Sequence, residues 1–420
     1  MRILVPIIGI LFLFSSCQPK NPREEVIDDS AIITALFYDQ LISTEELNIS
    51  NLNPFFTSMP KGGDLNHHYA GSLYAETFLD WIEQEGLFIN KCTFVLEPRQ
   101  VRRFDCPSIS VNEIRNDVVL FEQLIAEWSK KGYGNHYHAD LSPDPLFFNT
   151  FTNFETAPPE YLTSGLQSLK ERAINENVSY LESALGTIEL DQTIFFPLRR
   201  AEALNDSLLA AKNQAEVDLI LETIARNLIA NGAYNEKLAE YVNKIKDIHV
   251  GLDEEDFILR FQTYGVRTLA PLQVFMQLMS GFLVTETSPL VVGVNLVGPE
   301  NNRIALRDYS LHMQMFNFLH RKYPAVPRAL HAGELTLGMV RPKDLSFHIH
   351  EAITVAKAQR IGHGVDLPHE NDPFGLIEKL KTDSVVIEIN LSSNKNSVGV
   401  MGEDHPYLIY KKYGIPMVIS

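Results

Sequence analysis

Short apolar segments rich in β-branched residues alternate with amphipathic helical segments along most of this 420-residue chain. Near-continuous apolar strands that alternate with helices are typical of a parallel sheet covered by helices on both faces. The expected strands are 64–68, 178–183, 258–268, 290–297, 328–331, 360–362, 385–389 and 416–419. Eight strands are the number in a closed barrel, so the pattern predicts an α/β fold of the (β/α)8 TIM-type barrel class.

The first 16 residues have the pattern of an export signal peptide. Arg2 precedes an apolar run over residues 3–14, which is too short to span a bilayer. The Ser-Ser-Cys segment that ends at Cys17 resembles a bacterial lipoprotein signal. This resemblance implies cleavage before Cys17 and lipid anchoring of the exported protein to a bacterial membrane, on its periplasmic or cell-surface side. A plain secretory signal with an incidental cysteine is the alternative.

The remaining chain divides into an extension and a barrel. We expect residues 17–50 to form a tether and N-terminal extension and residues 51–420 to form the barrel. A stretch with Pro, Asn and His over 85–150 interrupts the alternation, which indicates an inserted subdomain after the first strand. In an exported protein its Cys92 and Cys106 favour a disulfide over two buried thiols. Residues 200–250 indicate a long helical excursion between strands.

Composition restricts the kinds of partner. The chain has 36 Lys and Arg against 53 Asp and Glu, a net charge of −17, which argues against binding to nucleic-acid phosphates. Its three cysteines are too few for a four-thiolate zinc site. We therefore expect a small-molecule partner.

Several expected strands end in polar residues that suit a catalytic metal centre. His68 ends the first strand, His331 and Glu334 lie at the end of the fifth, and His363 lies between two glycines at the end of the sixth. Barrel enzymes carry their reactive groups at these carboxyl ends, where imidazoles from different strands converge. Neutral imidazole is a zinc ligand, and Glu334 is placed to act as a proton shuttle beside the metal. His363 would act as a base for water or hold the hydroxide by charge.

Taken together, these motifs resemble the adenosine deaminase family. They are Met-Pro-Lys-Gly-Gly-Asp-Leu-Asn-His-His over 59–68, His-Ala-Gly-Glu over 331–334 and Arg-Ile-Gly-His-Gly over 360–364. The inserted subdomain and the Val-Ile-Ser segment that ends at Ser420 are most similar to the secreted, growth-factor-related branch of the family. The resemblance extends from about residue 60 to 420, with a poor match in the middle.

The resemblance implies zinc-dependent hydrolytic deamination of adenosine, or a related adenine nucleoside, to inosine and ammonia. His68 and His331 would be zinc ligands, Glu334 would protonate N1 of the purine, and His363 would position or deprotonate the attacking water. Gly298 would offer a backbone hydrogen bond to the purine. In this branch the inserted subdomain is often a dimer contact, so a homodimer is implied as well.

Two departures from the family pattern bear on activity. The family has His-x-His on its first strand, whereas this chain has Asn66 at the first position, and His67 faces the other way unless a bulge turns it. The chain also ends at Ser420, before the family's Asp-Asp pair. We therefore expect an incomplete eighth strand, a C-terminally truncated chain, weak zinc binding and little deaminase activity without the missing segment.

Two rival functions remain open. Ala70 stands where the classical branch has an acidic residue for the ribose, so deamination or hydrolysis of another purine derivative is one alternative. A catalytically impaired, nucleoside-binding lipoprotein is the other, favoured by Asn66 and by the missing aspartates. We expect Asp64 and Glu182 to support the site from outside, Ser392–Asn394 to form a polar loop that lines it, and His348 and His350 to be packing or capping residues.

Overall fold

The computed structural model of this chain describes residues 29–43, 47–129 and 161–420, which form two compact units, Met1–Met59 and Pro60–Ser420. The first unit contains α1 (Asp29–Ile42) and α2 (Ile49–Ser58). The ring of Tyr38 on α1 stacks on Phe55 of α2 at 5.3 Å between centroids. This packing groups α2 with α1, whereas the sequence division placed residues from 51 onward with the barrel.

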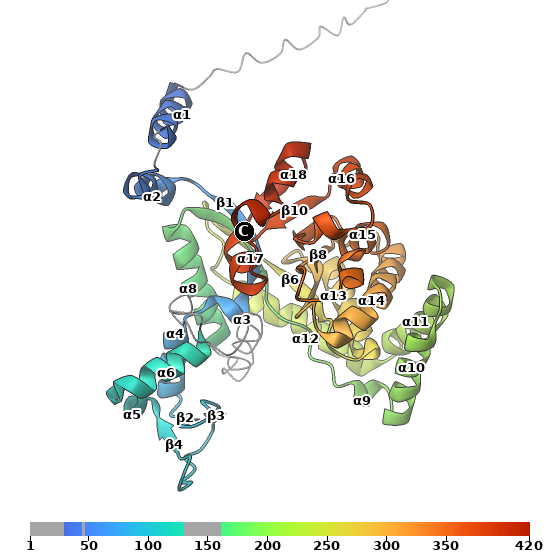
Figure 1. Cartoon of the computed structure of the whole chain (residues 1–420). Coiled ribbons are helices and arrows are strands. Elements are labelled where there is room, and N and C mark those ends of the chain that lie inside the picture. Colours follow the sequence, from blue (N-terminus) through green and yellow to red (C-terminus); the bar gives the residue numbers. More distant parts are fainter. Residues whose placement is uncertain (1–28, 44–46, 130–160) are drawn as a thin grey trace, which may run out of the picture. The chain divides into compact units, whose positions relative to one another are not determined.

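Eight parallel strands form the centre of the second unit, at the positions predicted from the sequence (Figure 1). One sheet has the order β1-β5-β6-β7 and the other β8-β9-β10-β11. Their bounds are β1 (Gly62–His68), β5 (Val178–Ala184), β6 (Ile258–Val266), β7 (Val291–Val297), β8 (Ala329–Ala332), β9 (Arg360–His363), β10 (Val386–Ile389) and β11 (Met417–Ile419).

Hydrogen bonds join the two sheets at both seams, between backbone groups at one and to a side-chain hydroxyl at the other. Val294 of β7 forms a parallel bridge with Arg328, and its N–H donates to the carbonyl of Pro327 at 3.0 Å. At the other seam, the Leu65 N–H of β1 donates to the Ser420 hydroxyl at 3.3 Å. The strands therefore follow one another around the axis in chain order, and the predicted TIM-type (β/α)8 barrel is confirmed.

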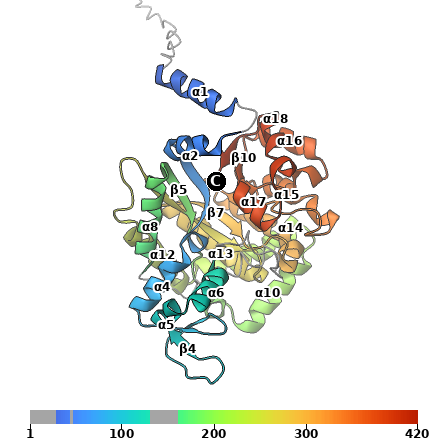
Figure 2. The ribbon, with the colours of Figure 1, turned by 60° about the vertical axis from the view of Figure 1, so that its left-hand side comes forward.

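Helices connect consecutive strands and cover the outer face, as Figure 2 shows for α8, α14 and α15. The connecting helices are α8 (Leu162–Asn175), α13 (Pro271–Thr287), α14 (Arg303–Lys322), α15 (His348–Thr354), α16 (Pro373–Thr382), α17 (Leu391–Ser397) and α18 (Tyr407–Tyr413). Short 3-10 turns lie at Pro342–Leu345, Leu367–His369 and Gly402–Asp404. Gly281 allows α13 to approach β6, because a Cβ there would lie 2.5 Å from the Thr263 hydroxyl.

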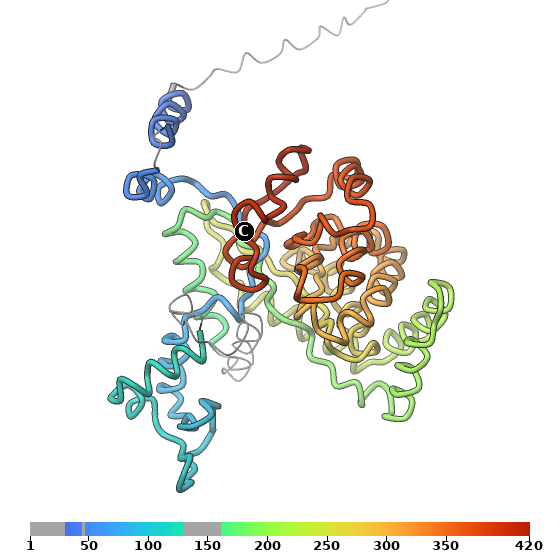
Figure 3. Tube along the Cα trace, in the orientation of Figure 1, coloured from blue at the N-terminus to red at the C-terminus, as the bar shows by residue number. Residues whose placement is uncertain are grey.

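The expected helical excursion over 200–250 is confirmed. After the short α9 (Gln192–Phe195), it consists of α10 (Leu198–Ala210), α11 (Gln214–Ile229) and α12 (Gly232–His249). Helices α10 and α11 of the excursion are the yellow-green coils at the lower right of the tube in Figure 3. Arg321 of α14 donates to both carboxylate oxygens of Asp218 on α11, at 2.6 and 2.7 Å, which ties α11 to the barrel.

The inserted subdomain follows β1 as predicted. Its described elements are α3 (Tyr69–Ser72), α4 (Ala75–Gln84), β2 (Phe88–Asn90), β3 (Leu96–Glu97), β4 (Ser108–Ser110), α5 (Val111–Asn116) and α6 (Val118–Trp128). The strands pair antiparallel in the order β3-β2-β4 around a core that includes Leu79, Ile89 and Ile114. A disulfide joins Cys92 and Cys106, so the predicted pairing is confirmed. The subdomain's residues from 130 to 150 lie outside the described part.

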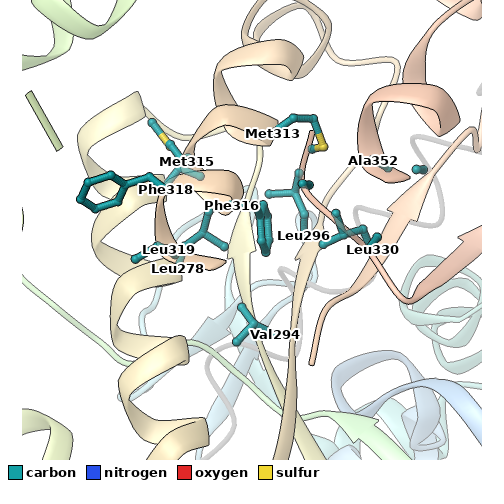
Figure 4. Close-up of a cluster of buried hydrophobic side chains, with 14 of the residues drawn as sticks. Leu278, Val294, Leu296, Met313, Met315, Phe316, Phe318, Leu319, Leu330 and Ala352 are labelled. Atoms are coloured by element: carbon teal, nitrogen blue, oxygen red, sulfur yellow. The ribbon is translucent and has the colours of Figure 1, made fainter. Parts of the chain in front are cut away.

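A large apolar cluster lies between the strands and the helices α13, α14 and α15. Figure 4 shows Phe316 of α14 beside Leu296 of β7, with Leu330 of β8 on the same side. The three side chains are at most 1% exposed, so they are fully withdrawn from water. None of the helices in the described ranges is long and apolar enough to cross a membrane.

Replacing Phe316 by alanine tests whether this cluster holds the barrel together. The Phe316→Ala change removes a fully buried ring and leaves a cavity, which should lower the free energy of unfolding by about 3–5 kcal/mol. Phe374 is 66% exposed, so Phe374→Ala should change it by less than about 1 kcal/mol. Denaturant unfolding curves measure both values, and equal effects of the two variants would contradict this account of the core.

Candidate metal and catalytic centre

Three side chains from β1 and β8 meet inside the barrel. Nε2 of His68 lies 3.0 Å from Nε2 of His331, and Oδ1 of Asn66 lies 3.2 Å from the same His331 nitrogen. Asn66 and His68 alternate with His67 along β1, which turns both of them toward the interior. The sequence-predicted ligand pair is therefore brought together, and Asn66 is the third group beside it.

The proton position on His331 follows from its neighbours. Oδ1 of Asn295 accepts the backbone N–H groups of Leu296 and His331, at 2.7 and 3.2 Å, so it is the acceptor of that amide. It lies 2.9 Å from Nδ1 of His331, which therefore donates. Nε2 of His331 must then present a lone pair, the form that binds a metal.

The lone pairs of Asn66 Oδ1 and His331 Nε2 therefore point toward each other. Nδ2 of Asn66 donates to Glu388 at 2.7 Å, so its Oδ1 turns toward the unprotonated Nε2 of His331. Two lone pairs at 3.2 Å repel each other unless a cation or a proton lies between them. Burial lowers the pKa of His68 to about 4 and that of His331 well below its usual value, so protonation does not resolve the contact at neutral pH.

The donor set fits a divalent cation. Two neutral imidazoles and an amide oxygen are all metal ligands, although the amide is a weaker ligand for zinc than imidazole or carboxylate. Within the described residues, no three His, Cys, Asp or Glu side chains lie close enough together to hold a metal ion. The present set has only two such side chains, since its third member is an asparagine. His68, His331 and Asn66 are the residues that would hold the ion.

His67 faces away from this set. The register of β1 against β5 is irregular between Asp64 and His67, so the bulge considered from the sequence is present. Nδ1 of His67 nevertheless lies 2.8 Å from the hydroxyl of Ser183 on β5. The idea that His67 turns inward to replace the missing imidazole is therefore wrong, because its ring is held by Ser183.

A buried charged network supports Asn66 from the barrel interior. Arg360 lies 2.7 Å from Glu388 and 2.5 Å from Glu182, and Gln262 donates to Glu182 at 2.6 Å. Glu388 is 1% exposed, and its burial raises its pKa. Glu182 was expected to support the site, whereas the sequence indicated no particular role for Glu388, a carboxylate inside an otherwise apolar strand. Asp64 accepts the Asn66 backbone N–H at 3.1 Å and supports the bulge.

Glu334 and His363 lie near His331. The His363 ring centroid is 5.2 Å from that of His331, and Oε1 of Glu334 is 3.6 Å from Nδ1 of His363, beyond hydrogen-bond distance. His363 has a φ of 75°, which side chains other than glycine rarely adopt. Asn394 contacts Nδ1 of His363 at 2.8 Å, from helix α17 rather than from the polar loop predicted there.

A buried glutamate shapes the turn that carries Glu334. Glu300 accepts the backbone N–H groups of Gly333 and Glu334 at 3.1 and 2.7 Å and contacts Nδ1 of His348 at 2.6 Å. Burial alone would raise its pKa, but the Arg267 guanidinium and these hydrogen bonds lower the pKa of Glu300 to about 2. His348 is thus the buried packing residue that the sequence analysis expected.

The remaining predicted site residues have simpler surroundings. Gly298 directly follows β7 with a φ of 97°, next to the Arg267 side chain. The Arg267 guanidinium in turn donates to the His331 carbonyl at 2.6 Å. His350 donates its backbone N–H to Glu370 at 3.1 Å at the start of α15. Cys17 lies outside the described residues.

Comparison with solved structures identifies the class of fold. Arabidopsis ADAL complexed with IMP matches with a TM-score of 0.50 and 16% identity, over 87% of this chain and 81% of that chain. An amidohydrolase from Burkholderia ambifaria with bound zinc matches with a TM-score of 0.52 and 14% identity, over 90% and 79%. No protein-family model and no curated protein matches the chain. The chain therefore shares the barrel fold of these hydrolase structures.

The buried acid Glu370 should give stability a distinctive pH dependence. Burial raises its pKa from 4.5 to about 7, although it accepts the N–H groups of Ile349 and His350. The folded state therefore binds more protons than the unfolded state between these values, and stability is lost as pH rises through this window. Relative to the natural protein, Glu370→Gln should gain up to about 3 kcal/mol between pH 4.5 and pH 8.

Denaturant unfolding at pH 5, 6, 7 and 8 measures this difference. Glu378→Gln, at an exposed position of α16, serves as the matched control and should show no pH-dependent difference. A constant offset between Glu370→Gln and the natural protein at all four pH values would contradict the prediction.

Proposed function

We propose that this protein is a metal-dependent hydrolytic deaminase of the adenosine deaminase type. Its substrate would be adenosine or a related adenine nucleoside, which it would convert to inosine and ammonia. The observation that carries the proposal is the convergence of His68 and His331 within 3.0 Å at strand ends, with Glu334 and His363 beside them. Zinc is the proposed metal because neutral imidazole is one of its preferred ligands.

Each residue has a distinct part in the proposed reaction. A bound zinc ion lowers the pKa of water and so makes hydroxide available near neutral pH. Glu334 would protonate N1 of the purine, which makes C6 more electrophilic. His363 would orient the attacking oxygen. The turn that carries Glu334 is held by Glu300 through two backbone hydrogen bonds, so the carboxylate is presented on a rigid support.

The compared structures support this substrate class. IMP, the ligand of the Arabidopsis structure, carries an oxygen at C6 of the purine, the position at which hydrolytic deamination of an adenine compound replaces the amino group by oxygen from water. The Burkholderia amidohydrolase contains zinc. Both names concern proteins less than 20% identical to this chain, so they favour purine deamination without choosing the nucleoside or nucleotide.

Two other functions compete with this proposal. Deamination or hydrolysis of a different purine derivative would use the same groups. A catalytically impaired nucleoside-binding protein is favoured by Asn66, because an amide at 3.2 Å from His331 replaces an imidazole ligand. We further propose that the protein is exported and lipid-anchored through Cys17 and that it forms a homodimer.

Metal content and turnover test the proposal directly. If the proposal holds, the purified protein binds about one equivalent of zinc when zinc is supplied, at the reduced affinity expected from Asn66, and changes the ultraviolet absorbance of adenosine, AMP or adenine at a correspondingly low rate. His331→Gln should lower zinc affinity and deaminase kcat/KM by at least about 100-fold, because it removes a ligand. His320→Gln on the outer helix α14 is the matched control and should retain both. Purine binding without zinc would instead support the nucleoside-binding protein.

Asn66→His tests the weak ligand. The change supplies a third imidazole beside His68 and His331, so zinc affinity should rise by about tenfold or more. Competition with a chelating dye measures the affinity. Unchanged affinity would show that position 66 is not a ligand position, whatever the activity of the natural protein.

A further inference from the structure

A series of hydrogen bonds leads from a backbone amide to His363. The Tyr407 N–H at the start of α18 lies 3.0 Å from Nδ1 of His405. A backbone N–H can only donate, so Nδ1 of His405 must present its lone pair. His405 is buried, and this burial lowers its pKa, which keeps the ring neutral near pH 7. The single proton of the His405 ring is therefore on Nε2.

That proton sets the orientation of the next side chain. Nε2 of His405 lies 3.1 Å from Oδ1 of Asn394, which accepts its hydrogen bond. The amide nitrogen of Asn394 is then turned toward Nδ1 of His363, at 2.8 Å. Asn394 is fully buried, so neither of these contacts is exchanged for water. Nδ1 of His363 accepts from this amide, which is closer than the Glu334 carboxylate oxygen at 3.6 Å, so the proton of the neutral His363 ring is on Nε2.

We propose that Asn394 and His405 are positioning residues that hold His363 as a neutral imidazole with its proton on Nε2, so that His363 donates a hydrogen bond to the attacking water rather than removing its proton. The proton position follows from the hydrogen bonds alone, whereas its catalytic meaning rests on the proposed function.

The local backbone supports this reading. His363 has a φ of 75°, a conformation that costs a non-glycine residue free energy and persists only where neighbours hold it. Asn394 from α17 holds its ring, and the Tyr410 hydroxyl from α18 donates to the Gly364 carbonyl at 2.6 Å. Two elements far along the chain therefore fix both the ring and the backbone at the end of β9.

If His363 donates to the attacking water, another group must accept the proton that the water loses. Since Nε2 of His363 already carries a proton, Glu334 would take the proton that water loses and pass it to N1 of the purine as the C6–O bond forms. The C6–N bond then breaks, and the proton of the new C6 hydroxyl leaves with the amino group as ammonia. Water thus supplies the oxygen at C6, the proton on N1 and the third proton of ammonia.

His331 carries its proton on the other ring nitrogen, Nδ1, and a second series of hydrogen bonds fixes it there. Glu182 accepts from Gln262 at 2.6 Å, and Gln262 accepts from Asn295 at 2.8 Å. Asn295 in turn accepts from Nδ1 of His331 at 2.9 Å. This series begins at an acceptor, a carboxylate, and leaves a lone pair on Nε2. The series to His363 begins at a donor, a backbone N–H, and leaves a proton on Nε2.

Substitutions that reverse the series test the proposal. Asn394→Asp keeps the shape of the side chain but can only accept, which moves the His363 proton to Nδ1. His405→Glu leaves Asn394 intact but offers it an acceptor, which should turn the amide and have the same effect. His405→Gln places an amide donor near the position of Nε2 and should preserve the natural arrangement. Asn317→Asp on α14, where Nδ2 donates to Gln214 at 3.1 Å, is the matched control.

Two measurements are made on each full-length variant. Nitrogen NMR of protein with labelled histidine reports which ring nitrogen of His363 carries the proton, with the signal assigned by its absence in His363→Gln. Steady-state kinetics of purine deamination separate kcat from KM. We expect Nε2–H in the natural protein, His405→Gln and Asn317→Asp. In Asn394→Asp and His405→Glu we expect Nδ1–H and a kcat lower by about 100-fold, with little change in KM.

The outcomes separate this inference from the proposed function. Nδ1–H in the natural protein, or full kcat in a variant with Nδ1–H, would overturn the donor role. Nε2–H in a natural protein that deaminates no purine would support the positioning series and reject the proposed function. If Asn394→Asp does not fold, His405→Glu against His405→Gln decides the question, since both leave Asn394 in place.

Discussion

The approach of His68 and His331 to 3.0 Å is the constraint on which the candidate centre depends. Two neutral imidazoles in that arrangement need a cation between them or one N–H that donates to the other ring, because two lone pairs at this distance repel each other. The barrel brings them together from β1 and β8, which lie in different sheets. Everything else in the centre either supports these two rings or faces them.

Buried polar side chains around the centre are arranged in series rather than as isolated pairs. Each series starts at a group that can only donate or only accept, Tyr407 N–H in one and Glu182 in the other. An amide side chain that accepts with its oxygen from one neighbour donates with its nitrogen to the next, so it passes the donor–acceptor direction along the series. In a low-dielectric interior a mismatched donor or acceptor is costly, so the polarity of the first group determines the last.

The strands could be predicted from sequence because parallel strands that are buried on both faces consist of apolar, β-branched runs between helical segments. Helix α17 was mistaken for a loop, since its Leu-Ser-Ser-Asn-Lys-Asn-Ser sequence has no apolar periodicity. Its one fully buried side chain is Asn394, which faces His363 and not an apolar core. The roles of Asn295, Asn394 and His405 were missed for the same reason: asparagine and histidine carry no pattern of their own in a single sequence.

The sequence by itself determined the barrel, the inserted subdomain and the identity of the groups at the strand ends, because these follow from local periodicity and from the rule that barrel strands end on one face. Only the tertiary structure decided that Asn66 faces the histidine pair while His67 contacts Ser183. It also decided on which nitrogen each imidazole carries its proton. Those features depend on contacts whose partners lie up to 265 positions apart, and no local pattern encodes the orientation of such a contact.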